Sequence, residues 1–148
     1  MKLPRLLAEH TQLAIDTAPL IYFLADDAKR ASLVQEVLNG AAAGRVHLVV
    51  SVVTEAELLV GPLQKNERDA VSVIARLLDG ASGIEVAPVS RGIAQEAARL
   101  RAEHKLSLPD AMVAATALQY GCTALLANDA AFARLDARLT YLHVDDLI

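Results

Sequence analysis

The sequence predicts an α/β protein, a three-layer α/β/α sandwich around a central, mostly parallel sheet of about five strands. Short apolar runs of strand character alternate with helical patterns along the 148 residues. The apolar fraction of 54% comes mainly from Ala, Leu and Val, and only 3% of residues are aromatic, so a helix-rich core is favoured over disorder. Continuous apolar strands separated by helices are expected when helices cover both faces of a parallel sheet.

The strands are predicted from five short apolar runs, of which the last is the weakest. In chain order, they are Leu13–Ile15, Val46–Val50, Ile84–Val86, Ala124–Leu126 and Tyr141–Val144.

Capping residues and prolines predict where two of the helices begin. Thr17 can cap one helix with Pro19 in its first turn. Ser107 can cap another with Pro109 similarly placed, and Gly121 can end it. Two amphipathic helices that cover the sheet are expected at about residues 28–43 and 91–104.

Length and composition predict a single domain over residues 1–148. A chain of this size buries roughly 68–70% of the surface that its unfolded form exposes, and the sequence has no internal repeat or Pro/Gly/Ser-rich linker. The single Cys122 lies in an apolar stretch, which predicts a buried, inert thiol. No apolar run approaches the ~20 residues of a membrane helix, and the first ten residues lack the apolar core of a signal peptide. We therefore expect a cytoplasmic protein.

Four acidic residues stand close to junctions between strands and helices. Asp16 closes the first strand, and Asp129 follows the fourth. Glu57 lies on the helix after the second strand, while Asp110 opens a later helix. Because ligands of an open parallel sheet bind outside the carboxyl ends of the strands, we expect these four carboxylates to face one edge of the sheet.

Each acid also has an ordinary structural explanation. An Asp after a strand commonly caps a helix or a turn, which applies to Asp16 and Asp129. Asp110 gains from the helix dipole in a first helical turn, and Glu57 completes a capping box with Thr54. Capping does not explain why acids from separate connections should share one crevice.

The charge of such a cluster predicts a metal site. Two carboxylates about 4 Å apart repel by roughly 4 kcal/mol at an effective dielectric constant near 20, so four ionised acids in one pocket need a cation. Oxygen ligands select hard ions such as Mg²⁺ or Mn²⁺, and the sequence has no Cys/His pair spaced for zinc. With such a metal on Asp16, Glu57, Asp110 and Asp129, the expected reaction is phosphodiester hydrolysis by an activated water.

Signature motifs of other enzyme classes are absent from the sequence. It contains no G-x-x-x-x-G-K-[ST] phosphate loop, no G-x-G-x-x-G dinucleotide turn and no G-x-S-x-G nucleophile elbow. Kinase-like, dehydrogenase and serine-hydrolase activities therefore have no support.

Four segments carry the acids in an order and spacing that span almost the whole chain: Ile15–Tyr22, Ser51–Gly61, Leu108–Ala117 and Ala127–Phe132. Together they resemble the PIN-domain ribonucleases, and within them the VapC-type toxins of toxin–antitoxin pairs. The resemblance implies an Mg²⁺- or Mn²⁺-dependent endoribonuclease that cleaves RNA. It also implies a homodimer that is silenced by a small antitoxin, whose tail occupies the active-site groove.

The resemblance also selects individual residues. Glu55 and Glu57 lie about 200° apart on a helix and both flank its apolar stripe, and the family pattern selects Glu57. Thr17 and Asn128 resemble supporting polar residues that orient a carboxylate or a metal-bound water, although either could simply cap a helix. Relatives commonly carry Ser or Thr where this chain has Ala127, so a hydroxyl that could help to hold the acids is missing, and weaker metal binding is expected.

The acidic net charge matches the proposed site. Lys and Arg number 14 and Asp and Glu 18, a formal charge of −4, so removing the four site acids leaves equal numbers of each sign. Two Mg²⁺ ions would offset the difference, and basic side chains near the crevice could hold phosphates. The low aromatic content limits base stacking and favours recognition of RNA by shape.

Two other functions compete with the nuclease. A PIN-like domain could act as an RNA-binding or partner-binding module with weak or no catalysis, and Ala127 is the support for that alternative. A phosphorylatable receiver domain would need a pocket lysine near its last strands. Lys105 is the only Lys after Lys65, and no suitable strand surrounds it.

Overall fold

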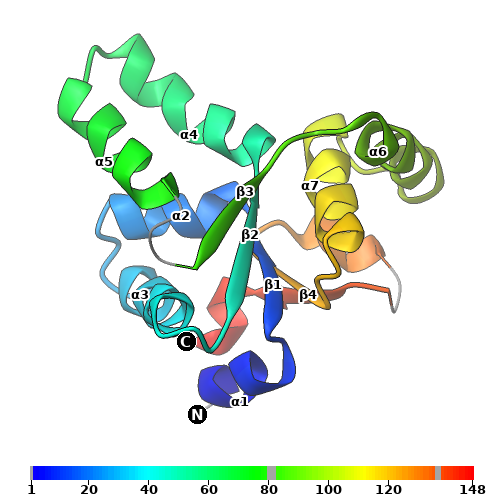
Figure 1. The fold of residues 1–148 in the computed structure, drawn as a ribbon, viewed down its shortest axis with the longest axis horizontal. Coiled ribbons are helices and arrows are strands. Elements are labelled where there is room, and N and C mark those ends of the chain that lie inside the picture. The colour runs from blue at the N-terminus through cyan, green and yellow to red at the C-terminus, as the bar shows by residue number, and fades with distance from the viewer. Residues whose placement is uncertain (1, 80–82, 136–137) are drawn as a thin grey trace.

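The computed structural model describes residues 2–79, 83–135 and 138–148, and it has a five-stranded sheet between two layers of helices (Figure 1). The strands are β1 (Gln12–Ile15), β2 (His47–Ser51), β3 (Ile84–Ala87), β4 (Ala124–Ala127) and β5 (Thr140–His143). The helices are α1 (Lys2–Glu9), α2 (Thr17–Leu24), α3 (Arg30–Ala42), α4 (Val52–Gln64), α5 (Arg68–Leu78), α6 (Arg91–His104) and α7 (Leu108–Gln119), with 3-10 helices η1 (Ala130–Arg134) and η2 (Val144–Leu147).

The strands lie in the order β3-β2-β1-β4-β5, and every neighbouring pair is parallel. This confirms the predicted α/β sandwich, and each of the five apolar runs contributes a strand. The chain builds outward from β1 to β3 and then crosses to β4 on the other side of β1. The direction of winding therefore changes between β1 and β4, and in such sheets ligands bind beside the carboxyl ends of the strands at that change.

Alternate strand residues face two separate cores. One face packs against α1 to α5, and its strand residues include Leu13, Ile15, Leu48, Val50 and Leu126. The other face packs against α6, α7 and η1, and its strand residues include Ala14, Val49, Leu125 and Ala127. Because the two helical layers in Figure 1 cover both faces, β1, β2 and β4 consist almost entirely of buried residues, whereas the edge strands β3 and β5 are partly exposed.

The predicted limits of α7 are confirmed. The Ser107 hydroxyl accepts a hydrogen bond from the Asp110 backbone amide at 3.3 Å, which caps the helix. Gly121 follows the helix end with a φ of +71°, a conformation that glycine adopts without strain. Cys122 is buried, as predicted, and burial raises the pKa of its thiol to about 12.

Two capping predictions are wrong because strands β1 and β2 run directly into helices. Asp16, not Thr17, precedes α2, and Thr17 is the first helical residue. Ser51 caps α4 by accepting from the Val53 amide, so Thr54 is fully buried within the helix and forms no capping box with Glu57. None of the helices in the described part of the chain is long and apolar enough to cross a membrane.

Candidate active site

Asp16 lies at the carboxyl end of the central strand β1. Its backbone amide donates to the Leu126 carbonyl at 2.9 Å, which extends the β1–β4 ladder by one residue. This register sets Asp16 beside Ala127, on the face of the sheet that α6 and α7 cover. The Asp16 carboxyl is therefore held in the fold's interior, and the residue is only 7% exposed.

Burial and neighbouring charges raise the pKa of Asp16 to about 6. Desolvation is the largest cause, and the Thr17 backbone amide partly opposes it. The negative charges of Asp110, Glu57 and Asp129 each raise this pKa further. The four acids selected from the sequence are thus close enough to repel one another, although they come from different elements of the fold.

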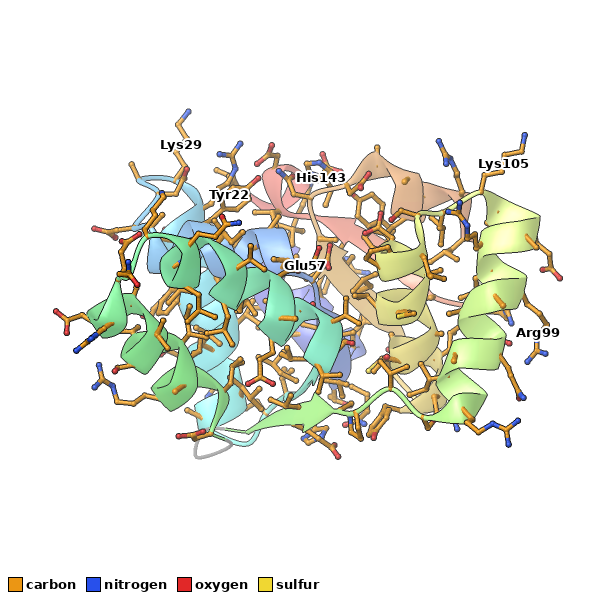
Figure 2. The ribbon with its side chains drawn as sticks, turned by 90° about the horizontal axis from the view of Figure 1, so that it is seen from above. Tyr22, Lys29, Glu57, Arg99, Lys105 and His143 are labelled. Carbon is orange, nitrogen blue, oxygen red and sulfur yellow. The ribbon has the colours of Figure 1, made fainter. Side chains whose placement is uncertain are left out.

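Glu57 reaches the site from α4 and is held there by Thr17. The Thr17 hydroxyl donates to Glu57 Oε1 at 2.7 Å and lies 3.3 Å from the Thr54 hydroxyl. Figure 2 looks onto the carboxyl ends of the strands, with Glu57 near the centre between the two helical layers. Thr17 therefore contacts the Glu57 carboxylate directly.

Asp110 and Asp129 form a carboxyl pair. Burial raises the pKa of Asp110 to about 6, and the charge of Asp129 and a side-chain hydrogen bond with it raise the pKa further. Protonated Asp110 can thus donate to the Asp129 carboxylate. Asp129 Oδ1 also accepts from the Ala131 amide at 2.9 Å, so this acid caps η1 while facing the cluster.

The donor set suits a hard divalent cation in its chemistry. Four carboxylates provide only oxygen ligands, which Mg²⁺ and Mn²⁺ prefer, and a cation would relieve the repulsion that raises the pKa values. Within the described ranges, however, no three His, Cys, Asp or Glu side chains are grouped closely enough to hold one metal ion. The four acids are close to one another but do not form a preformed metal site. To bind one ion together, their side chains would have to rotate toward it.

Asn128 connects the site to residues that sequence reasoning did not select. Its side-chain amide donates to the Tyr22 hydroxyl. The Tyr22 ring lies under the Arg30 guanidinium, 4.7 Å from its centroid. Arg30 in turn binds both carboxylate oxygens of Asp145, at 2.7 and 3.1 Å. Residues that are far apart in sequence thus support Asn128, and no local motif indicates this pairing.

Tyr141 and His143 also lie beside the site because β5 pairs with β4. The register sets His143 opposite Ala127, one strand away from Asp16. Tyr141 packs against Phe132 and His143, and its hydroxyl is buried without a hydrogen-bond partner among the described residues. Burial, and then the charge of Asp129, raise the pKa of Tyr141 to about 12. The weak strand pattern was visible in the sequence, but the register was not.

An apolar groove of about 440 Å³ leads away from Glu57 between α2, α4 and α5. Its walls include Ile21, Leu58 and Val73, and Ile21 and Val73 are 46% and 40% exposed. Lys65 and Glu67 lie at the same groove. This is a surface on which an apolar segment can pack next to a site carboxylate.

A comparison with protein families identifies the class. A family model described as the PIN domain matches residues 13–138, and the chain belongs to this family. PIN domains are generally nucleases that use divalent metal ions.

Solved structures of toxin–antitoxin complexes share this fold. VapBC-1 from nontypeable Haemophilus influenzae is 21% identical, with a TM-score of 0.67 over 90% of this chain and 98% of that chain. DNA-bound VapBC from Salmonella typhimurium is 19% identical, with a TM-score of 0.66 over 90% and 98%. VapBC2 from Rickettsia felis, bound to a promoter DNA fragment, is 15% identical, with a TM-score of 0.66 over 89% and 98%. No curated protein sequence matches the chain.

Proposed function

We propose that residues 1–148 form a single PIN-like domain that hydrolyses RNA phosphodiester bonds as a metal-dependent endoribonuclease. The observation that carries this proposal is the mutual effect of the carboxylates, since three acids from other elements raise the pKa of buried Asp16. Such a cluster costs folding free energy, and a cation that binds a phosphate would offset that cost.

Each side chain has a role in this proposal. Asp16, Glu57, Asp110 and Asp129 hold Mg²⁺ or Mn²⁺. Thr17 fixes one oxygen of Glu57, leaving the other for the metal, and Asn128 holds the turn that presents Asp129. The chemistry that the bound ion supplies is a lowered pKa for the attacking water and stabilisation of charge on the leaving oxygen.

The partners follow from the groove and from the relatives. We propose that the chain is the toxin of a toxin–antitoxin pair in the cytoplasm and acts as a homodimer. An amphipathic antitoxin segment would lay its apolar face in the groove between α2, α4 and α5 and reach the carboxylates beside Glu57. Light scattering of the purified protein measures the dimer directly.

The test is RNA cleavage by the purified protein. A structured tRNA pool and a single-stranded RNA are incubated with the protein in Mg²⁺, in Mn²⁺ or in EDTA, beside an Asp16→Asn variant. We expect cleavage that requires the metal and is lost in the variant. Cleavage that persists in EDTA or in Asp16→Asn would contradict a metal-dependent nuclease.

The binding-module alternative rests on Ala127, which is fully buried beside Asp16 and supplies no hydroxyl to it. The same assay separates the two functions. RNA that binds in the presence of Mn²⁺ without being cut would favour the binding module, and Ala127→Ser would then test whether a hydroxyl restores cleavage.

A further inference from the structure

Three cations gather where α6, α7 and η1 meet, and we call Arg101, Lys105 and Arg134 the basic rim. All three residues are exposed. In the part of the chain that the structure describes, none of them forms an ion pair with a carboxylate. Glu103, the acid nearest to Arg101 and Lys105 in sequence, lies 3.9 Å from His104 instead.

Both guanidinium groups of the basic rim are held by hydrogen bonds to backbone carbonyls, which do not neutralise their charge. Arg101 donates to the Leu106 carbonyl at 2.8 Å, and Arg134 donates to the Lys105 carbonyl at 3.0 Å. A guanidinium has five N–H donors, so each keeps donors for an anion. Because the side chains are already ordered, binding an anion would cost less conformational entropy than it would from a free side chain.

Three other surface arginines differ from the rim because they bind carboxylates. Arg30, on the opposite side of the site, contacts the carboxylates of both Asp27 and Asp145. Arg99 and Arg138 share Glu96. Lys29 and Lys65 are also exposed without an ion pair among the described residues, and Lys65 lies at the groove beside Glu57. The rim differs from them because its two guanidinium groups are held by backbone carbonyls.

The rim is joined to the acids through two adjacent segments. Lys105 precedes Asp110 by five residues, and Arg134 follows Asp129 by five. The two segments meet through the carboxyl pair at one end and through the Arg134–Lys105 hydrogen bond at the other. Five residues of a 3-10 helix span roughly 10 Å, close to the Debye length of about 8 Å at physiological salt.

Arg101 also has an ordinary structural role, because a cation in the last turn of α6 favourably interacts with the helix dipole. Lys105 is the C-cap residue of α6 and Arg134 is the last residue of η1, so a helix dipole favours a cation at each of these positions too. Figure 2 shows Lys105 at the end of α6, on the opposite side of Glu57 from Lys29.

We propose that Lys105 and Arg134 bind backbone phosphates next to the scissile one, so that the RNA leaves the carboxylates across the α6–α7 loop and η1. This inference rests on the proposed nuclease function and assigns the side on which its substrate lies. Contacts to phosphate position the strand without reading its sequence. The rim should therefore contribute affinity and register for any RNA.

Binding is measured with the Asp16→Asn protein, so that the RNA stays intact. The probe is a fluorescent RNA hairpin with single-stranded ends, titrated between 50 and 200 mM salt in Mg²⁺. In this background, Lys105→Gln with Arg134→Gln should weaken binding and lower the slope of log affinity against log salt by roughly 0.7 to 0.9 per lost phosphate contact. Arg134→Lys should restore part of the affinity.

The matched control is Arg45→Gln with Arg76→Gln. It removes the same charge where α3 leads into β2 and α5 leads toward β3, at the opposite edge of the sheet. It should leave the salt slope unchanged. Equal slopes for the rim and control variants, or no binding of the hairpin by Asp16→Asn at 50 mM salt, would overturn the proposal.

Cleavage by the otherwise unchanged enzyme keeps this inference separate from the proposed function. The rim variants should raise KM several-fold with kcat within about twofold, because they lose contacts made equally in the bound and transition states. If the unaltered protein cleaves nothing in Mg²⁺ or Mn²⁺, the nuclease proposal fails while the binding measurement still reports on the rim. If the rim variants had a lower thermal stability but an unchanged salt slope, Arg134 would only stabilise the α6–α7 loop through its hydrogen bond to the Lys105 carbonyl.

Discussion

At the scale of single residues, the Thr17 hydroxyl holds Glu57 through a 2.7 Å hydrogen bond. Thr17→Val keeps the shape of the side chain and removes this donor. We expect the Mn²⁺ concentration for half-maximal cleavage to rise by about 10- to 100-fold, which is typical when a residue that orients a metal ligand is lost. Thr11→Val, an exposed threonine before β1, is the control and should leave the Mn²⁺ dependence unchanged.

Tyr22 makes a second testable contact, since its hydroxyl bonds Asn128 while its ring lies under Arg30. Tyr22→Phe keeps the ring and removes the hydroxyl. Cleavage should fall about tenfold or more because Asn128 loses its partner next to Asp129, with little change in melting temperature.

Tyr141→Phe is the matched control. The buried Tyr141 hydroxyl has no hydrogen-bond partner among the described residues, so its removal should leave cleavage unchanged and leave the melting temperature unchanged or slightly raised. Loss of stability in Tyr22→Phe with cleavage unchanged would assign Tyr22 to folding alone.

At the scale of elements, the positions of the strands in the sequence were predictable, but the register in which they pair was not. Each strand is a short apolar run bounded by polar residues, which a sequence displays directly. The capping errors arose because Asp16 and Ser51 end strands and begin helices at once, so the residues that resembled caps lie inside the helices.

The grouping of Asp16, Asp110 and Asp129 at one edge of the sheet could be predicted from their places after strands or at a helix start, whereas the choice of Glu57 over Glu55 came from the family resemblance. The other residues that surround these carboxylates could not be predicted. Tyr22, Tyr141 and His143 reach the site through tertiary packing and the β4–β5 register, and nothing in the nearby sequence marks them. The exceptions are Thr17 and Asn128, whose places next to Asp16 and Asp129 in family-like segments suggested supporting roles.

The start of β3 gives a prediction at the same scale. Gly83 has a φ of +74°, and a Cβ at this residue would lie 2.3 Å from the Ala41 carbonyl oxygen of α3. Gly44 has a similar φ of +77° but has nothing within 4 Å of such a Cβ. Gly44→Ala should therefore cost about 1 kcal/mol from backbone strain. Gly83→Ala should cost clearly more, because backbone has to move. Urea denaturation measures both, and equal losses would show that α3 moves away freely.

At the scale of the whole molecule, the fold brings several acids together at one edge of the sheet and lowers its own stability by doing so. Asp16 and Asp110 ionise less readily in the folded protein than in the unfolded chain, since their pKa values rise from 3.8 to about 6. The acids that pair with Arg30 behave in the opposite way, because its guanidinium and nearby amides lower the pKa values of Asp27 and Asp145. The contribution of Asp16 and Asp110 to folding stability thus falls as the pH rises, whereas the contribution of Asp27 and Asp145 grows.

These signs predict how stability depends on pH in EDTA. A raised pKa in the folded state means that the stability from protonated Asp16 is present below pH 3.8 and is lost as the pH rises through about 6. For Asp16, which is almost fully buried, the loss is about 2 to 3 kcal/mol at 1.36 kcal/mol per pKa unit. Asp27 and Asp145 contribute stability above their unfolded pKa and lose it at lower pH. Stability should therefore fall mainly between about pH 4 and pH 6 and stay lower at pH 7 than at pH 5, in the range where the Arg30 pairs are formed.

A divalent cation should reverse this fall, since it binds the ionised carboxylates and competes with their protons. Mn²⁺ should raise the melting temperature more at pH 7 than at pH 5, by an amount that grows with the concentration of Mn²⁺. Asp16→Asn should be more stable than the unaltered protein at pH 7 in EDTA, show a weaker pH dependence, and gain less from Mn²⁺. Thermal unfolding of both proteins at the two pH values measures all of these effects. If the unaltered protein became more stable from pH 5 to pH 7 in EDTA, the acids would not be destabilising one another, and the electrostatic basis for a metal at this edge would be removed.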